Sequence, residues 1–194
     1  MAAPQDIIFE NITKSYGNQK VLANFSQTFE AAQSYCLMAP SGTGKTTLLK
    51  LLAGIEQPDQ GKIQGLENKK ISMVFQEDRL LESYTAVENI RFACGKNISI
   101  EEIQRLLEAF LGKTDFALPV NRYSGGMRRK VCLLRALLAP SDLLLLDEPF
   151  TGMDEDSRRM ACQLIRTYRA GRTLILSSHD RQDAQLLEAQ ILSL

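Results

Sequence analysis

The feature that most constrains this chain is a glycine-rich turn at residues 39–47, which reads Ala-Pro-Ser-Gly-Thr-Gly-Lys-Thr-Thr. It follows an apolar run at residues 35–38, read as a strand, and precedes a helical pattern at residues 46–53. Glycines at such a turn let backbone amides curl around phosphate oxygens, and the helix N-terminus adds a partial positive charge. Lys45 can reach the β- and γ-phosphates of a nucleoside triphosphate, and the Thr46 hydroxyl suits Mg²⁺. The turn therefore predicts an α/β domain that binds a nucleotide.

The loop departs from its usual form, G-x-x-x-x-G-K-[ST], because its first glycine is Ala39 here. Alanine would be strained at that position if the backbone required a positive φ. A glycine-rich turn that binds nothing is the alternative, and the order of strand, loop, Lys45, Thr46 and helix disfavours it. We expect every residue of the loop to contact the triphosphate: Ala39, Pro40, Ser41, Gly42, Thr43, Gly44, Lys45, Thr46 and Thr47.

Two adjacent acids, Asp147 and Glu148, follow the apolar residues 143–146 and precede Pro149. Acids at the C-terminal end of a buried strand lie where α/β sheets bind ligands. Asp147 can hold Mg²⁺ through a water, and Glu148 can polarise a water in line with the γ-phosphorus. The alternative is that both acids merely end a strand and bind nothing. The presence of the phosphate loop in the same chain disfavours this alternative.

The rest of the chain alternates strand and helix patterns. Residues 7–12 and 21–29 alternate like strands around a turn, and short apolar runs at residues 71–75 and 174–177 predict buried strands. Capping-box patterns at residues 85–88 and 99–102 each open a helix, so approximately residues 80–140 predict a helical subdomain. Further helices are expected at residues 155–169 and after His179, with a last strand at residues 190–194. Such alternation predicts a mainly parallel sheet.

Charge and composition limit the classes of partner. The 23 basic and 23 acidic residues cancel, which gives no general affinity for nucleic acid or anionic lipid. No apolar run approaches the ~20 residues that cross a bilayer, and the N-terminus lacks a signal-peptide pattern. The four scattered cysteines are typical of core residues in a reducing compartment. We therefore expect a cytosolic protein that reaches a membrane only through a partner.

A third motif lies at residues 123–130, Tyr-Ser-Gly-Gly-Met-Arg-Arg-Lys. A serine and two glycines at a helix start offer an anion a hydroxyl, bare N–H groups and the helix dipole, although an N-capped helix is the alternative. This segment resembles L-S-G-G-Q, the signature of the ABC ATPase family, with Tyr123 and Met127 at its flanks. The resemblance covers nearly the whole chain. It implies a P-loop NTPase fold with a mainly parallel sheet, a small antiparallel β-subdomain and a helical subdomain, in a single domain over residues 1–194.

The resemblance also implies roles for residues outside the three motifs. Tyr16 matches the aromatic residue that stacks on adenine, Gln76 the loop glutamine at the Mg²⁺ and water, and His179 the switch histidine at the γ-phosphate. Residues 151–154 resemble the D-loop. The catalytic set is then Glu148, His179, Gln76 and Lys45, and the Mg²⁺ set is Thr46, Gln76 and, through water, Asp147. ATP binding adds Tyr16, Ser124, Gly125, Gly126 and Asp154 to the loop residues.

By resemblance, two copies face head to tail and close over two ATP molecules. Lys45 of one copy and Ser124 with Gly126 of the other then hold the same triphosphate. Ligand contacts made only in the closed state shift the open–closed equilibrium, which couples nucleotide binding to motion. The implied partners are integral membrane permease subunits, a second ATPase subunit and a solute-binding protein, at the inner face of the cell membrane and without nucleic acid.

The leading hypothesis is the ATP-hydrolysing subunit of an ABC transporter that imports a small solute. Residues 73–81, Met-Val-Phe-Gln-Glu-Asp-Arg-Leu-Leu, are similar to those of nitrate, sulfonate and taurine importers. A soluble ABC ATPase outside transport is the alternative. Leu80, Leu81 and Tyr84 are read equally as core or as a docking groove. The segment between Gly54 and Ile71 predicts a trimmed β-subdomain, and the short chain after His179 predicts no C-terminal regulatory domain.

Overall fold

The computed structural model describes residues 5–194 and divides the chain into two compact units. The sheet unit comprises Met1–Met73, Ser141–Asp147 and Gly171–Leu194, described from residue 5 onward. The helical unit comprises Val74–Pro140 and Glu148–Ala170. No helix among the described residues is long and apolar enough to cross a membrane.

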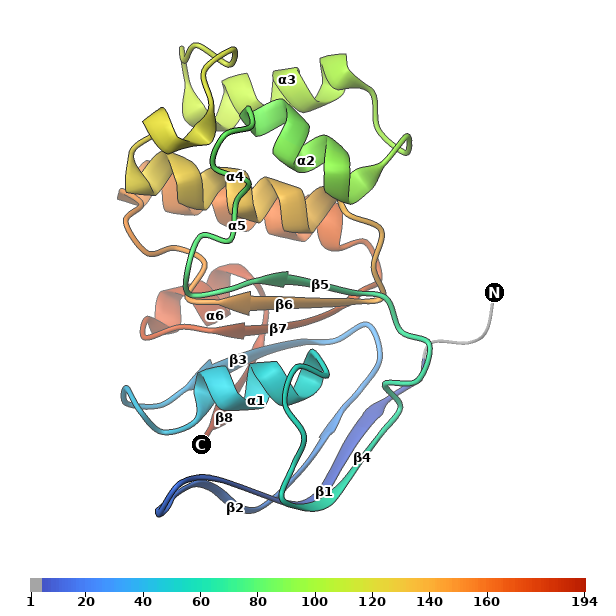
Figure 1. Cartoon of the computed structure of the whole chain (residues 1–194). Helices are drawn as coiled ribbons and strands as arrows, with labels where there is room; N and C mark the ends of the chain where they lie inside the picture. The colour runs from blue at the N-terminus through green and yellow to red at the C-terminus, as the bar shows by residue number, and fades with distance from the viewer. Residues whose placement is uncertain (1–4) are drawn as a thin grey trace. The chain divides into compact units, whose positions relative to one another are not determined.

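A five-stranded sheet has the strand order β5-β6-β7-β3-β8 (Figure 1). The strands are β3 (Ser34–Met38), β5 (Ile71–Val74), β6 (Leu143–Asp147), β7 (Thr173–Ser177) and β8 (Gln190–Ser193). The pairs β3·β7, β3·β8 and β6·β7 are parallel, which confirms the expected sheet. Every residue of β6 and β7 is buried, and this explains their unbroken apolar sequences, because parallel sheets are covered on both faces.

The antiparallel sheet is small and has the order β2-β1-β4. It consists of β1 (Ile7–Tyr16), β2 (Gln19–Phe29) and β4 (Gln60–Gln64), which confirms the small antiparallel β-subdomain. β1 runs beyond the predicted residue 12 because register shifts after Phe9 and Ile12 let its polar end keep pairing with β2. Sequence reasoning missed β4, whose residues Gln-Gly-Lys-Ile-Gln are polar and exposed or half-buried and show no apolar alternation.

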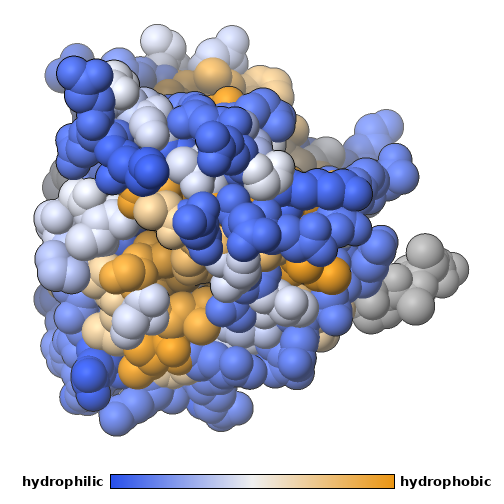
Figure 2. Space-filling view, turned by 90° about the horizontal axis from the view of Figure 1, so that it is seen from below, coloured by the Kyte–Doolittle hydropathy of each residue, from blue (hydrophilic) through white to orange (hydrophobic). Residues whose placement is uncertain are grey.

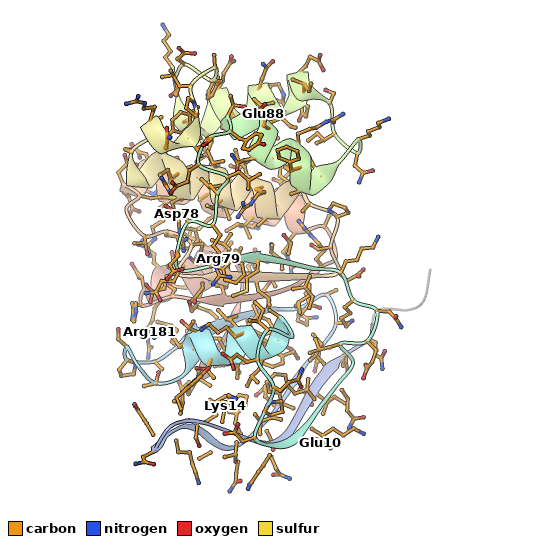
Figure 3. The ribbon with its side chains drawn as sticks, in the orientation of Figure 1. Glu10, Lys14, Asp78, Arg79, Glu88 and Arg181 are labelled. Carbon is orange, nitrogen blue, oxygen red and sulfur yellow. The ribbon has the colours of Figure 1, made fainter. Side chains whose placement is uncertain are left out.

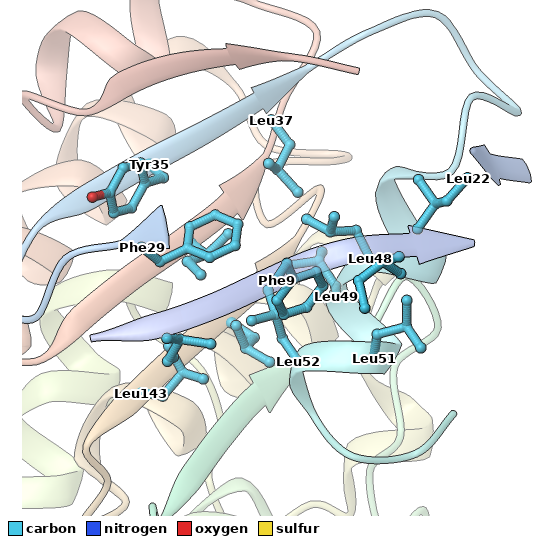
Figure 4. Close-up of a cluster of buried hydrophobic side chains, with 14 residues drawn as sticks. Phe9, Leu22, Phe29, Tyr35, Leu37, Leu48, Leu49, Leu51, Leu52 and Leu143 are labelled. Carbon is cyan, nitrogen blue, oxygen red and sulfur yellow. The ribbon is translucent and has the colours of Figure 1, made fainter. Parts of the chain in front are cut away.

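One apolar cluster joins the two sheets and helix α1 (Lys45–Leu52) within the sheet unit (Figure 4). The rings of Phe9, Phe29 and Tyr35 pack edge to face, with centroids 5.8 and 5.2 Å apart. Leu48 and Leu49 of α1 are fully buried in the same cluster. Burying the helix here fixes its N-terminus, where the phosphate loop ends.

The helical unit consists of α2 (Ala86–Cys94), α3 (Ile100–Leu111), a short 3₁₀ turn (Val120–Arg122), α4 (Gly125–Leu138) and α5 (Glu155–Arg169). α3 buries residues at the three- and four-residue spacing of an amphipathic helix, and they are Ile103, Leu106, Leu107 and Phe110. Helices α2, α3 and α5 all contact α4. The remaining helix, α6 (Arg181–Leu186), belongs to the sheet unit and contacts β3.

The two predicted capping boxes differ in the structure. Thr85 and Glu88 form both reciprocal bonds at the start of α2. At the start of α3, Ser99 accepts from the Glu102 amide at 3.1 Å, but the Glu102 carboxylate binds Arg105 at 2.7 and 2.8 Å. The second box is therefore half formed, because an arginine one turn along the helix competes for the carboxylate.

Candidate nucleotide-binding site

The predicted site residues divide between the two units. The sheet unit holds the phosphate loop with Tyr16, Asp147 and His179, and the helical unit holds Gln76, the signature residues, Glu148 and Asp154.

The backbone of the phosphate loop turns through its glycines. Gly42 and Gly44 have φ values of +83° and +102°, whereas Ala39 is not among the residues with positive φ. The loss of the first glycine therefore causes none of the strain that a positive φ would impose. A Cβ on Gly44 would lie 2.9 Å from Cγ1 of Val21 on β2, so this position requires glycine for its space as well as its φ.

Lys45 is the first residue of α1 and is 6% exposed. Its Nζ donates to the carbonyls of Ala39, at 2.6 Å, and Pro40, at 3.1 Å. The Thr43 hydroxyl donates to the Pro40 carbonyl at 2.8 Å. The ammonium group thus lies inside the curve of the loop, where phosphate oxygens can replace the carbonyls as its acceptors.

The structure brings Thr46 and Asp147 together across 101 positions of sequence. The Thr46 hydroxyl donates to Oδ2 of Asp147 at 2.8 Å, and the Ser177 hydroxyl donates to Oδ1 at 2.7 Å. Asp147 is 1% exposed, and both its oxygens are oriented by these neighbours. Mg²⁺ at nucleotides takes few protein oxygens and completes its shell with phosphate and water. A hydroxyl and a carboxylate in contact beside the phosphate loop fit that ion.

His179 follows β7 on a turn fixed by buried polar groups. The Ser178 hydroxyl donates to the buried carboxylate of Asp183 and accepts from the Asp180 amide at 3.0 Å. Asp180 in turn accepts from the amide of Gln182 at the start of α6. These bonds hold the backbone on both sides of the exposed His179. Tyr16, at the end of β1, is 43% exposed, so its ring offers a face for stacking.

Glu148 adopts an unusual backbone conformation, with φ of +46°. The left-handed region costs a residue other than glycine roughly 1–2 kcal/mol. Its carbonyl accepts from Nη2 of Arg129 at 2.8 Å and from the Thr151 hydroxyl at 3.1 Å. A hydrogen bond from a charged donor contributes about 1.5–3 kcal/mol, which suffices to hold the strained conformation. Sequence reasoning placed Arg129 in the signature segment and Thr151 in the D-loop but gave neither side chain a role, because only the fold brings their donors to this carbonyl.

The signature residues begin α4. Ser124 caps the helix by accepting from the Met127 amide at 3.3 Å, and Gly125 and Gly126 form its first turn. A Cβ on Gly126 would lie 2.8 Å from the Gly152 carbonyl of the predicted D-loop, so close backbone packing already requires this glycine. Asp154 caps α5 by accepting from the Ser157 amide at 2.8 Å, and that bond lowers the pKa of its carboxyl.

Tyr123 replaces the leucine of the common signature and is buried. Its hydroxyl finds no hydrogen-bond partner among residues 5–194, and burial raises its pKa. The ring therefore acts as a packing residue, as leucine would.

The segment after β5 contains Gln76 and has both buried and exposed residues. Figure 3 labels Asp78 and Arg79 on this segment, and Gln76 itself is exposed. Leu80 is 8% exposed and belongs to the core, whereas Leu81 and Tyr84 are 47% and 44% exposed. Of the three residues for which the sequence favours core and docking groove equally, Leu80 thus belongs to the core, and Leu81 and Tyr84 lie on the surface. Phe92 of α2 is 64% exposed and packs edge to face on Tyr84, with centroids 5.4 Å apart.

Comparison with known proteins gives the family. The family model described as ABC transporter matches residues 22–151, which include the phosphate loop, the signature and the acidic pair. The chain belongs to the ABC transporter family. Membership confirms the resemblance inferred from the motifs and agrees with the α/β fold described above.

ABC proteins of known function are similar to this chain along most of its length. The Fe(3+) ions import ATP-binding protein of Brucella abortus is 36% identical, over 93% of this chain and 56% of the relative. The sulfate/thiosulfate import ATP-binding protein of Mesostigma viride is 31% identical, over 95% and 58%. The Nod factor export ATP-binding protein I of Burkholderia lata is 32% identical, over 95% and 66%. The chain thus spans between about half and two thirds of the length of these relatives.

Solved ABC cassettes share the fold. A dimeric ATP-binding cassette in a post-hydrolysis state, bound to ADP and Pi, superposes with a TM-score of 0.83 at 25% identity, over 97% of this chain and 94% of that one. A dimeric bacterial ABC transporter cassette gives 0.80 at 26% identity, over 96% and 94%.

Proposed function

We propose that this chain is the ATP-binding and ATP-hydrolysing subunit of an ABC transporter and energises transport through separate membrane subunits. The observation that carries the proposal is the contact between Thr46, in the phosphate loop, and Asp147, at the end of β6. This pair and Lys45 provide what a Mg²⁺-nucleotide needs, namely a cation for the phosphates and two oxygens for the metal.

The proposed chemistry is the attack of water on the γ-phosphorus. Loop amides and Lys45 bind the phosphates and stabilise the charge of the transition state. Glu148 accepts a proton from the water while the water oxygen bonds to the γ-phosphorus. The bond between the γ-phosphorus and the oxygen that bridges to the β-phosphate breaks, and ADP leaves with that oxygen. Gln76 orients the water, and His179 donates a hydrogen bond to the γ-phosphate. Thr46, Gln76 and, through a water, Asp147 would hold Mg²⁺, which would neutralise phosphate charge.

Residues 1–194 act as one ABC ATPase domain in this proposal, with a helical subdomain over approximately residues 80–140. Two copies bind ATP between the phosphate loop of one and Ser124, Gly125 and Gly126 of the other, with Tyr16 on adenine and Asp154 in the D-loop. A relative in fold is dimeric and binds ADP and Pi, which supports this arrangement.

The proposed partners are membrane permease subunits at the inner face of the cell membrane, with a solute-binding protein in the same complex. Exposed Leu81, Tyr84 and Phe92 in the helical unit offer an apolar docking surface for a permease segment. Figure 2, seen from below, shows a face on which hydrophobic side chains gather between polar ones.

The proposed direction is import of a small solute, in the branch of nitrate, sulfonate and taurine importers. The sequence around Gln76 supports this branch. Import proteins for Fe(3+) and for sulfate/thiosulfate are among the relatives, as is an exporter of Nod factor.

Two measurements test the proposal. Purified protein should hydrolyse ATP in a Mg²⁺-dependent reaction, and the tagged protein should co-purify from detergent-solubilised native membranes with an integral membrane subunit in stoichiometric amount. Hydrolysis together with recovery of soluble or ribosomal partners alone would overturn the transport assignment and favour a soluble ABC ATPase. Absence of any ATP hydrolysis by the complex would overturn the enzymatic assignment.

A further inference from the structure

We propose that Arg129 is a positioning residue for ATP hydrolysis, which holds the main chain at Gln76 and Glu148. The inference rests on the proposed ATPase function. Arg129 lies in the second turn of α4, shortly after the signature residues, and is 3% exposed. Its role follows from where its guanidinium donates hydrogen bonds.

The guanidinium connects two separate backbone segments of the helical unit. Nη2 donates to the Glu148 carbonyl at 2.8 Å. Nη1 donates to the Phe75 carbonyl and, at 3.4 Å, to the Gln76 carbonyl. Asp78 lies 3.5 Å from the same Nη1 and partly balances the buried charge. One planar group therefore sets the spacing between the residue proposed to activate water and the residue proposed to orient it.

The Glu148 end of this connection needs support, because its φ of +46° is a conformation that glutamate rarely adopts. Strained backbone persists where neighbours hold it and is concentrated at functional sites. Besides Arg129, the Thr151 hydroxyl donates to the same carbonyl at 3.1 Å and the Thr151 amide at 3.3 Å. Loss of either side-chain donor would let the backbone relax and move the carboxylate away from its proposed line with the phosphorus.

The neighbouring Arg128 provides a matched control. It lies 3.7 Å from Asp78 and 3.3 Å from Glu82, and both partners are carboxylates on the segment that contains Gln76. Glu82 is mostly exposed, so this pairing contributes little. Arg128 and Arg129 thus have the same helix, the same charge and the partner Asp78 in common. They differ in that Arg129 donates to the Glu148 carbonyl.

The test compares steady-state ATP hydrolysis and thermal unfolding of the whole protein with those of four variants, at Arg128, Arg129, Glu148 and Thr151. Arg129→Met, which keeps length without donors, should lower kcat about 10- to 100-fold, since small displacements of catalytic groups have effects of that size. Its KM for ATP should stay within about threefold, because the loop and Lys45 are intact. Arg128→Met should keep kcat within about twofold.

A second variant avoids the risk that Arg129→Met fails to fold. Thr151 is exposed, and Thr151→Val removes its hydroxyl donor to the Glu148 carbonyl while the Thr151 amide, 3.3 Å from the same carbonyl, remains, so kcat should fall without a loss of stability.

The outcomes separate the inference from the function on which it rests. If wild-type protein hydrolyses ATP and Glu148→Gln does not, unchanged kcat in both Arg129→Met and Thr151→Val overturns the positioning role alone. An equal fall of kcat in Arg128→Met and Arg129→Met also overturns it. Absence of hydrolysis in the wild type, or full hydrolysis in Glu148→Gln, overturns the proposed function instead.

Discussion

The Lys45 side chain makes hydrogen bonds within its own loop. Its Nζ donates to two carbonyls of its own loop, so the cation is already inside the turn and needs no large movement to meet a triphosphate. Burial limits the rotamers of Lys45, so its side chain would lose less conformational entropy when a ligand binds. The residue therefore contributes to the shape of the loop and, in the proposed function, to affinity for phosphate.

Changing Lys45 to alanine should reduce ATP affinity about 100-fold or more, since two charge-assisted bonds of about 1.5–3 kcal/mol are lost. Isothermal titration with ATP measures the effect. Lys50→Ala, in the last turn of the same helix, is the control and should bind as the wild type does. Undiminished affinity of Lys45→Ala would contradict the phosphate-loop assignment.

Changing Glu148 to glutamine should abolish turnover and leave ATP binding intact, because only the proton acceptor is removed. The rate of phosphate release and the affinity for ATP are measured on the same preparation. Glu155→Gln, on the surface of α5, controls for loss of a nearby carboxylate. Full turnover in Glu148→Gln would remove Glu148 from the role of base.

At the scale of elements, the start of each helix is where local sequence and fold agree best. α2 and α3 begin at the predicted caps, and α3 ends at Leu111 before Gly112, whose φ is +76°. The same pattern nevertheless gives two bonds at Thr85 and one at Ser99. Arg105 makes the difference, because it takes the carboxylate that would close the second box.

Replacing Thr85 with valine should lower the free energy of unfolding by about 1 kcal/mol near neutral pH. Hydrogen bonds from the Thr85 amide and, to a smaller extent, from the Thr85 hydroxyl lower the pKa of the Glu88 carboxyl below its ordinary 4.5, and valine removes only the hydroxyl bond. Their contribution is therefore present above that value and lost as pH falls through the folded pKa. Urea unfolding at pH 7 and pH 3 should show a larger difference between variant and wild type at pH 7. Ser99→Ala, at the half-formed box, should destabilise less, and an equal effect would contradict the argument.

At the scale of the whole molecule, the chain divides predicted catalytic groups between two units. Lys45, Thr46, Asp147 and His179 lie in the sheet unit, and Gln76, Glu148 and the signature residues lie in the helical unit. In the proposed dimer, ATP links the sheet unit of one copy to the helical unit of the other. Ligand contacts available only in the closed state then shift the protein toward closure.

Glu148→Gln with ATP and Mg²⁺ should therefore form a dimer, because the nucleotide that holds the copies together is not hydrolysed. Light scattering after size-exclusion chromatography should give twice the 21.7 kDa of the chain with ATP and a monomer without it. Ser124→Ala in the same background removes a proposed contact in the partner copy and should weaken the dimer. A monomer at saturating ATP in Glu148→Gln would contradict the sandwich.

The sequence by itself determined the parts whose signals are local. Phosphate-loop glycines, helix caps and apolar strands depend on neighbours within a few positions, so the fold class and most elements could be predicted. The polar edge strand β4 could not, since its residues pair through backbone groups and carry no apolar pattern.

Only the tertiary structure decided which distant groups meet. The register of β6 against β7 pairs Asp147 with Ser177, and a shift of one residue would point these side chains to opposite faces. The fold likewise brings Arg129 to the carbonyls of Phe75 and Glu148, and it gives Ala39 a backbone without positive φ. Such contacts depend on how elements pack across long separations, which no local pattern encodes.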